Sequence, residues 1–385
     1  MPTLMRMTLA VVFTSVCITA SAPTLLWKTS LQANDPSLEQ VSSPKATAKS
    51  VFTSNTFNIT IVDRTTGAFK TNVACPDPGS CSMFPGGIAV GNDIYVTSLW
   101  GNVTAYDGAG RVVWNITVPC QPSAFQGVWM AAAAGGGTLA DASVLLVCDN
   151  AMPPMLIDGA TGNVLSTAAT SLWTPTDPVF IPGQGQRPSM WIVGSSNLTA
   201  LAHPSLDVLW SRDIEAMSLD YNRRDGSAVY FVGVSQLAAF STNDGTLLWS
   251  VATNCNSGVR WTSANTVTCF DPNTDQPSLL THDSRTGALA HRWNATSQCN
   301  GGFVAVPNAA GLLAWTLCTH VALYDCARGE MIYNVQLLHS RYDQPLNAGT
   351  MVGRVLYASN PSVVVAIDMG PSAEGTPFRR VIGDT

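Results

Sequence analysis

A glycine turn that returns about every 42 residues constrains the fold of this chain more than any other feature. Six segments carry it, each with apolar residues after the glycine, and with a seventh, glycine-free segment counted the interval between turns runs from 39 to 52 residues. A seventh segment, LAHPSLDVLW from Leu201, has Leu206 in the place of glycine. The six turn glycines are Gly67, Gly110, Gly162, Gly245, Gly287 and Gly329. A fixed period of this length predicts a repeat architecture.

Short runs of β-branched and aromatic residues precede and follow each turn, as in AVYFVGVS from Ala228 and QLAAFS from Gln236. Their alternation at period two predicts strands, and they lack the 3.6-residue period of a helical repeat. Four short strands in about 42 residues is typical of a propeller blade. We expect the innermost strands near 84–90, 128–134, 177–183, 215–222, 257–264, 302–308 and 346–352.

Two residue types keep a fixed distance from the turn glycine. Aspartates stand four residues before it, where a carboxylate accepts turn amides, so we interpret them as structural rather than catalytic. Tryptophans stand four residues after the glycine position and are placed to pack between neighbouring sheets, with the ring N–H near the edge. The aspartates are Asp63, Asp158, Asp283 and Asp325, and the tryptophans are Trp114, Trp210 and Trp249.

The two ends of the chain complement each other. The last repeat lacks an outer strand after Asp368, whereas the N-terminal segment Thr24–Trp27 (TLLW) is identical to Thr246–Trp249. A strand from the opposite terminus closes a ring and removes an exposed edge. The sequence therefore predicts an all-β fold, an eight-bladed β-propeller of four-stranded antiparallel blades, closed by an N-terminal strand in the last blade.

The chain divides into five predicted segments. Arg6 and the uncharged apolar run Leu9–Ala20 indicate a signal peptide over 1–22, with an N-terminal core strand as the alternative. A closing strand (23–31), a flexible linker (32–50), the propeller repeats (51–370) and a C-terminal tail (371–385) follow. No later stretch is long and apolar enough for a membrane span. We expect a secreted protein, extracellular or in the secretory-pathway lumen, or periplasmic in a bacterium.

Cysteines recur at the same junction between repeats. Cys120, Cys255 and Cys299 each lie six residues after a tryptophan, and each precedes a cysteine of the next blade. Sequence alone cannot fix the connectivity. A metal site is the alternative, but no CxxC motif occurs, and no cysteine pair has a histidine at ligand spacing. The disulfide candidates are Cys75, Cys81, Cys120, Cys148, Cys255, Cys269, Cys299 and Cys318, which leaves Cys326 over.

Five Asn-X-Thr sequons are candidate glycosylation sites if the host is eukaryotic. Chance supplies roughly four in a chain of this composition, so their number carries no weight. They are Asn58, Asn102, Asn115, Asn197 and Asn294.

Charge and motifs exclude several functions. A net charge of −6 offers no basic stripe for nucleic acid and no polybasic patch for anionic lipid. The five histidines are scattered, and no nucleophile elbow or zinc-protease motif occurs. The expected inner strands carry few carboxylates, and Glu215 and Asp220, five apart, should point to opposite faces. We therefore assign no catalytic residue, no metal site and no cofactor, and interpret Arg223–Arg224 beside Asp225 as a solvated turn.

The repeats resemble the pattern Ala-x-Asp-x-x-Thr-Gly-x-x-x-Trp of the quinoprotein-like (PQQ-repeat) propeller family. Ala239–Trp249 comes close to it, and Ala105–Trp114 matches with one turn residue deleted. That family includes quinone-dependent dehydrogenases, a bacterial outer-membrane assembly lipoprotein and sensor ectodomains of stress kinases. In length and eight-blade build the chain is most similar to the non-enzymatic assembly-scaffold members.

The resemblance implies a secreted, non-catalytic, monomeric propeller that binds a protein or a glycan through one of its faces. The alternative is a pyrroloquinoline-quinone-dependent dehydrogenase. Eight-bladed alcohol dehydrogenases of the family carry an adjacent cysteine pair over the quinone and a Ca²⁺ ion held by Glu, Asn and Asp. No two cysteines are neighbours in this chain. A propeller hydrolase or lyase is a third class, disfavoured because convergent ionisable groups are not evident.

Overall fold

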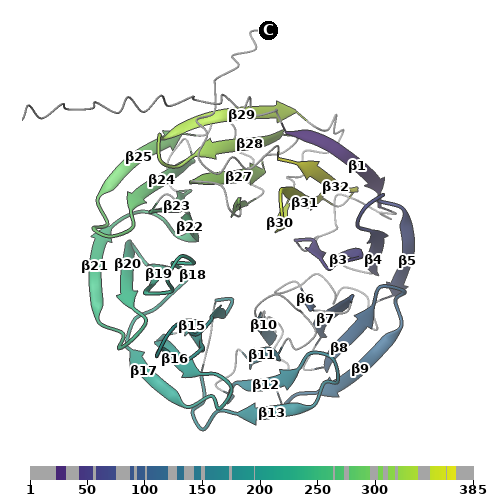
Figure 1. The fold of residues 1–385 in the computed structure, drawn as a ribbon, viewed down its shortest axis with the longest axis horizontal. Coiled ribbons are helices and arrows are strands. Elements are labelled where there is room, and N and C mark those ends of the chain that lie inside the picture. Colours follow the sequence, from purple (N-terminus) through teal and green to yellow (C-terminus); the bar gives the residue numbers. More distant parts are fainter. Residues whose placement is uncertain are drawn as a thin grey trace, which may run out of the picture.

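Four-stranded sheets follow one another around a closed ring (Figure 1). The structure is a computed structural model, and no helix occurs among its described residues. These are 23–31, 43–54, 58–74, 87–90, 93–99, 102–119, 128–133, 143–148, 152–172, 176–194, 196–262, 265–272, 277–294, 302–306, 311–316, 320–336, 347–360 and 362–369.

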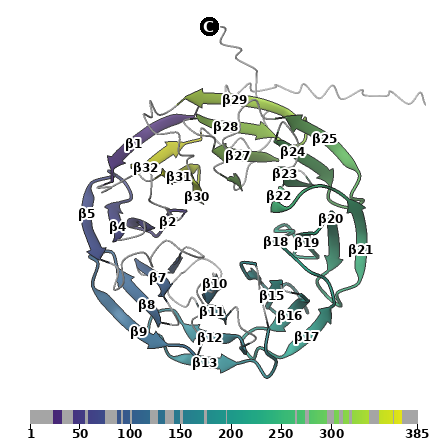
Figure 2. The ribbon, with the colours of Figure 1, turned by 180° about the vertical axis from the view of Figure 1, so that it is seen from behind.

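Each sheet is one blade, and its strands run in sequence order from the ring axis to the rim, except that the N-terminal strand β1 is the outermost strand of the last blade (Figures 1 and 2). The first four blades comprise β2 (Lys45–Ala46), β3 (Ser50–Ser54), β4 (Asn58–Asp63), β5 (Phe69–Ala74); β6 (Ile88–Val90), β7 (Ile94–Leu99), β8 (Asn102–Asp107), β9 (Val112–Thr117); β10 (Val128–Ala133), β11 (Ser143–Cys148), β12 (Met155–Asp158), β13 (Val164–Thr167); and β14 (Val179–Ile181), β15 (Met190–Gly194), β16 (Leu198–Ala202), β17 (Val208–Arg212). The other four comprise β18 (Ser218–Tyr221), β19 (Ala228–Gly233), β20 (Gln236–Ser241), β21 (Leu247–Ala252); β22 (Ser257–Thr262), β23 (Thr266–Asp271), β24 (Ser278–Asp283), β25 (Leu289–Asn294); β26 (Phe303–Ala305), β27 (Leu312–Thr316), β28 (His320–Asp325), β29 (Glu330–Gln336); and β30 (Asn347–Val352), β31 (Val355–Asn360), β32 (Val363–Asp368), β1 (Thr24–Ser30).

The hydrophobic core lies between neighbouring blades. One buried cluster, for example, joins Tyr230 and Val232 of β19 to Val259 of β22 and Val267 of β23. The second and third strands of each blade are buried on both faces, which explains their near-continuous apolar runs. The stacking of blades through apolar faces, expected from the repeats, is confirmed.

A β-bulge in the outer strand turns one large side chain toward the next blade. In the fifth blade Leu247 pairs with Phe240 and Trp249 pairs with Ala239, so Leu248 is the extra residue. Leu247 and Leu248 are 57% and 52% exposed, whereas Trp249 is 8% exposed. The same register shift recurs in the outer pairs of the other blades. A bulge re-aims the residue that follows it, which places the repeat tryptophan between the sheets.

The buried indole rests on the turn of the following blade. Trp249 Nε1 donates to Ser284 O over 3.0 Å, and Trp210 and Trp114 make the same bond to Thr242 O and Gly159 O. A Cβ atom added at the turn glycine of that blade would lie 2.5 Å from the Trp249 ring. Glycine is therefore required twice, by this close approach and by a φ near +70°. The inter-blade position predicted for the tryptophans is confirmed.

The exception at Leu206 follows the same geometry. At the junction of the third and fourth blades, Ser166 takes the place of the tryptophan, and its hydroxyl donates to Pro204 O. Leu206 keeps the positive φ, at 63°, and its side chain is 1% exposed within the cluster of that junction. Without an indole against the turn there is room for a side chain, which explains how leucine replaces glycine here.

The N-terminal strand closes the ring. β1 pairs antiparallel with β32, with Trp27 opposite Ala366, and the purple and yellow strands lie side by side in both views (Figures 1 and 2). Trp27 Nε1 donates to Arg64 O over 3.1 Å, and the Thr29 hydroxyl donates to Gly67 O. The closing strand thus makes the same indole contact as the internal repeats. The predicted fold class and closure are confirmed.

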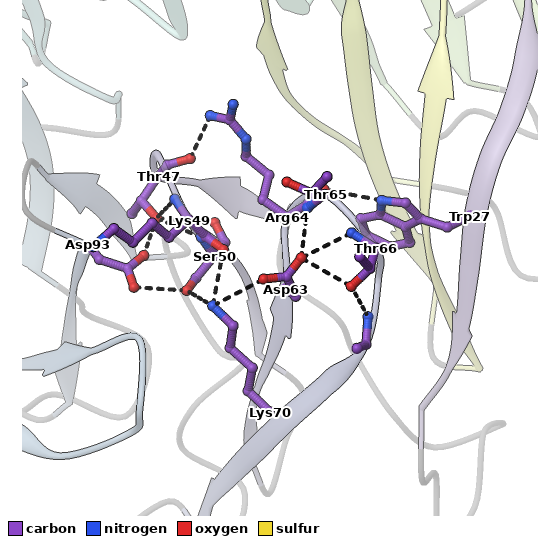
Figure 3. Close-up of polar contacts among 11 residues, drawn as sticks. Trp27, Thr47, Lys49, Ser50, Asp63, Arg64, Thr65, Thr66, Lys70 and Asp93 are labelled. Carbon is purple, nitrogen blue, oxygen red and sulfur yellow. Dashed lines mark hydrogen bonds and ion pairs between the residues drawn. The ribbon is translucent and has the colours of Figure 1, made fainter.

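A polar network stabilises the junction of the first and second blades, where Thr71 stands in the tryptophan position. Asp93 accepts hydrogen bonds from the hydroxyls of Thr47 and Ser50 (Figure 3). Lys70 donates to Ser50 Oγ over 2.8 Å, and its Nζ lies 3.7 Å from Asp63. These charged and hydroxyl groups add to the buried apolar cluster of the same junction, in which Phe52 stacks on Tyr95.

The innermost strands fall where the repeats predict them, with one addition. β2 (Lys45–Ala46) lies within the segment expected to be a flexible linker, 32–50, and pairs with β3. Residues 32–42 of that segment, the whole signal segment 1–22 and the tail 371–385 lie outside the described residues. Glu215 also differs from expectation, because β18 begins at Ser218 and only Asp220 of the two carboxylates lies on that strand.

We predict that Gly287→Ala destabilises the ring more than an alanine at a positive-φ glycine in open space. The left-handed backbone costs about 1–2 kcal/mol with a Cβ, and the contact with Trp249 adds about 1–3 kcal/mol. Gly185→Ala is the control, because Gly185 has a φ of +60° and no atom within 4 Å of the added Cβ. Denaturant midpoints compare the two, and equal losses would contradict the packing role.

Trp27→Ala should weaken ring closure by about 3 kcal/mol through lost packing and one lost hydrogen bond. Leu26→Ala, one residue earlier in the same strand and 51% exposed, should change stability by less than about 0.5 kcal/mol. Thermal denaturation and limited proteolysis measure both variants. Equal protection of the two variants would show that the indole does not hold the closing strand.

Candidate functional site: a cationic cavity at the ring axis

One face of the ring carries two turns from each blade, and we call it the turn face. The turn between the first and second strands lies beside the turn between the third and fourth, as Ser284 N shows by donating to Asn265 O. The same backbone bond joins Thr242 N to Ser227 O and Cys326 N to Gly311 O. The glycine turns and the first turn of every such blade are therefore presented together.

A cavity of about 560 Å³ opens where the inner strands of three blades reach this face. We call it the axial cavity. Its wall comes from β22, β26 and β30, and from the turn between β18 and β19. Three arginines line it together with apolar side chains: Arg223, Arg224, Arg260, Trp261, Val304, Val306 and Met351. Ligand sites typically combine a mainly apolar wall with a few polar groups.

Arg223 is fixed by a carboxylate beneath the cavity. Its two terminal nitrogens donate to the two oxygens of Asp220, over 2.6 and 3.1 Å. The Asp220 side chain is only 4% exposed, and it also accepts the backbone N–H of Trp261 over 2.7 Å. Asp220 therefore joins the fifth blade to the inner strand of the sixth and holds the first turn of its own blade in place.

Arg224 and Arg260 add positive charge to the same cavity. Arg224 is exposed on the turn next to Arg223, and Arg260 projects from β22 and donates to Val259 O. Asp220 pairs with Arg223, and Asp225 and Asp177 interact electrostatically with Arg224 and Arg260. Each guanidinium group of the lining therefore has a carboxylate within electrostatic range.

Further charges face each other across the ring axis. Lys45 of the first blade, Asp177 beside the fourth and Arg260 of the sixth are close enough to affect one another's titration. Burial lowers the pKa of Lys45, with Asp177 opposing this shift and Arg260 adding to it. Burial likewise raises the pKa of Asp177, and the two cations oppose that shift. The Asp177 side chain still reaches solvent, so water screens these interactions.

The structure revises the sequence interpretation of Arg223 and Arg224. They lie on a turn, as expected, but the turn is anchored by Asp220 and lines a cavity. No local signal distinguishes such a turn from a solvated one, because Arg260 and Trp261 come from another blade. No acid and base pair forms among the described positions of Asp177, Glu215 and Asp220. The Asp220 carboxylate accepts hydrogen bonds from Arg223 instead.

Of the cysteine candidates, Cys255 and Cys269 are joined in a disulfide with Cα atoms 5.9 Å apart. It links the end of the fifth blade to β23 of the sixth. Cys148 is also disulfide-bonded, to a cysteine outside the described residues. Cys326 is a buried thiol whose pKa burial raises to about 12. Cys75, Cys81, Cys120, Cys299 and Cys318 lie outside the described residues.

The sequon asparagines lie at strand ends or on the rim. Asn102, Asn115 and Asn294 are exposed, and Asn58 and Asn197 are half-buried. Asn102 accepts a hydrogen bond from Thr117, the hydroxyl residue of the neighbouring sequon, and Asn294 accepts one from Ser278. Modification at these sites remains a prediction.

The residues of the axial cavity do not match the donors of a calcium–quinone site. Among the described residues, no three of His, Cys, Asp and Glu gather in one place. The carboxylate under the cavity, Asp220, is held by Arg223 and a backbone amide. The disulfide of Cys255 and Cys269 lies buried between two blades. Hard oxygen ligands must converge to hold Ca²⁺, and the described lining supplies arginines instead.

Comparison with known proteins identifies the fold. BamB from Moraxella catarrhalis has a similar structure, with a TM-score of 0.63 and 14% sequence identity over 90% of this chain and 100% of that one. The computationally designed Ika8 protein is also similar, with a TM-score of 0.61 and 11% identity over 88% and 98% of the two chains. No family model and no curated protein matches the sequence. The fold is an eight-bladed β-propeller, as in these two structures. No helix in the part of the chain that the structure covers could cross a membrane.

Asp220 and Arg223 should behave as one unit. We predict that Asp220→Asn and Arg223→Gln each destabilise the protein, and that the double variant loses less than the sum of the two. The coupling should be about 1 kcal/mol, because the Asp220 side chain is only 4% exposed, whereas that of Arg223 is 45% exposed and solvent screens it. Urea denaturation of the four proteins gives this value. Additive losses would mean that the pair does not anchor the turn.

Proposed function

We propose that this protein is a non-catalytic propeller that binds a protein partner through the axial cavity and the turn face around it. The observation that carries the proposal is the lining of the cavity, in which Arg224 and Arg260 stand beside apolar side chains. Such a lining offers recognition groups. The Asp220 carboxylate under the cavity is already committed to a structural role.

The architecture supports a binding role. A rigid ring presents a wide face on which turns from several blades are held by backbone hydrogen bonds. In length and eight-blade build the chain resembles the non-enzymatic assembly-scaffold members of the quinoprotein-like propellers. Fold alone does not determine function, so the cavity supplies the argument, and the resemblance agrees with it.

We further propose that the protein acts outside the cytosol, in the secretory pathway, the extracellular space or a periplasm. Disulfides persist in oxidising compartments, and the bond between Cys255 and Cys269 joins two blades. The exposed sequon asparagines on the rim are accessible to glycosylation in a eukaryotic host. The apolar N-terminal run supplies the export signal that this location requires.

Cross-linking in the native compartment tests the binding role. Wild-type protein is compared with Arg224→Glu, which reverses a cavity charge, and with Lys28→Glu, the same reversal on the exposed rim strand β1. We expect a protein that cross-links to the wild type and to Lys28→Glu, and that is recovered about tenfold less with Arg224→Glu. A tenfold loss corresponds to about 1.4 kcal/mol of binding free energy.

Three outcomes would count against the proposal. Equal recovery by all three proteins would place the partner elsewhere on the surface. Loss of capture after enzymatic removal of partner glycans would identify a glycan ligand. Turnover of an alcohol or sugar with a dye acceptor, after addition of Ca²⁺ and pyrroloquinoline quinone, would establish the dehydrogenase alternative.

A further inference from the structure

We propose that two adjacent pockets on the turn face, at the junctions of the fourth, fifth and sixth blades, bind a neutral oligosaccharide. We call them the junction pockets. They reach the outer strands β17 and β21, whereas the axial cavity lies among inner strands. The inference therefore goes beyond the proposed function.

Neutral amides dominate the polar lining of the first junction pocket, which has a volume of about 580 Å³ and lies between the fourth and fifth blades. Gln184 and Gln186 come from the loop between β14 and β15, and Asn243 comes from the glycine turn of the fifth blade. All three side chains are exposed, and among the described contacts their amide groups make no hydrogen bond within the protein. They are therefore available to a ligand.

The charged groups of this pocket are already compensated. Arg187 donates to Gly226 O and to Thr242 Oγ1, and it interacts electrostatically with Asp225. Asp225 also accepts the backbone N–H of Ser227 over 2.8 Å. Because the guanidinium and the carboxylate face each other, the pocket favours a neutral ligand over an anion or a cation.

The chemistry of the lining matches a sugar. A side-chain amide donates with its nitrogen and accepts with its oxygen, and a hydroxyl group likewise does both. A sugar ring carries hydroxyls around its edge and C–H groups on its faces, and the exposed apolar residues Pro188 and Leu209 can pack against such a face. An extended peptide would instead need apolar pockets for its alternate side chains, and two exposed apolar residues do not form them.

Long loops build the walls of both junction pockets before any ligand is bound. Residues 182–189 connect β14 to β15 and residues 222–227 connect β18 to β19, whereas only residues 353–354 connect β30 to β31. Two backbone hydrogen bonds between Gln184 and Arg187, of 3.0 and 3.2 Å, hold the first of these loops as a hairpin. A wall that is ordered in advance lowers the entropic cost of binding.

The second junction pocket repeats the first one blade further along the ring. It has a volume of about 520 Å³, Leu248 of β21 takes the place of Leu209 of β17, and Asn222 and Asn265 supply amide groups. Asp225 lines both pockets, so they are adjacent. A ligand made of repeating units can occupy both pockets at once, and the second contact raises its apparent affinity.

Binding of defined saccharides tests the inference. Saturation-transfer NMR and calorimetry measure maltohexaose, cellohexaose and mannohexaose against the full chain. We expect at least one of them to bind the wild type, and to bind the double variant Gln186→Ala/Asn243→Ala about tenfold more weakly, or about 1.4 kcal/mol. Binding should not change with salt, because a neutral ligand gives salt no charge interaction to screen.

Asn163→Ala is the matched control. Asn163 is an exposed amide beside the glycine turn of the third blade and lines neither junction pocket, so its variant should bind like the wild type. Absence of binding by all three saccharides at about 10 mM overturns the inference. Equal binding by the wild type and the double variant overturns it too, as does a preference for an acidic oligosaccharide that disappears in high salt.

A glycopeptide with a high-mannose glycan distinguishes a glycan carried on a protein from a free saccharide. Asn243-dependent binding of either one supports the inference, and the tighter of the two identifies the source. Binding that survives enzymatic removal of the glycan overturns the inference, because the peptide would then be the ligand.

The result is independent of the protein-binding role of the axial cavity. Gln186 and Asn243 do not line that cavity. Loss of saccharide binding in their double variant, with unchanged cross-linking of a protein partner, assigns two separate sites. Failure of every saccharide to bind overturns the junction pockets and leaves the Arg224-dependent cross-linking of the proposed function to be judged by its own experiment.

Discussion

The contact between an outer-strand indole and the glycine turn of the next blade is the constraint on which the ring depends. It fixes three things together: the left-handed turn residue, the bulge that re-aims the strand, and the rotation between one sheet and the next. Trp27, Trp114, Trp210 and Trp249 each donate to a turn carbonyl of the following blade. Because the interaction links consecutive units, it also explains why the sequence repeats at a nearly constant interval.

The ring tolerates departures from this contact because other side chains fill the tryptophan position at the junctions that lack it. His291 replaces the indole before the seventh blade and contacts Ala327 O over 2.9 Å. At the junction of the third and fourth blades, Ser166 stands in place of the tryptophan, and the Leu206 side chain packs in the cluster there. At the junction of the first and second blades, Thr71 stands in the tryptophan position, and the polar network around Asp93 contributes to the contact (Figure 3). β1 supplies the outer strand of the last blade, and its Trp27 makes the indole contact with the turn of the first blade.

The sequence predicts most of the fold because the determinants of a blade are local and repeated. Glycine turns, aspartates and period-two runs identify blades, and the duplicated TLLW identifies closure. β2 (Lys45–Ala46) could not be predicted, because a strand of two residues has no alternation to detect. The candidate site escapes for a different reason. Asp220, Arg223, Arg260 and Met351 belong to three blades, and only the ring brings them within reach of one cavity.

The inner and outer strands of a blade have different structural roles, which explains why the axial cavity lies among the inner strands. Outer strands and glycine turns are committed to contacts between blades, so substitution there alters the ring. Inner strands are short edges with fewer neighbours, and their ends can carry charged residues at little cost to stability. In this chain they carry arginines, within a turn face whose periphery is acidic. The arginines near the axis and the aspartates of the outer turns thus follow the same radial order that the stacking of blades imposes.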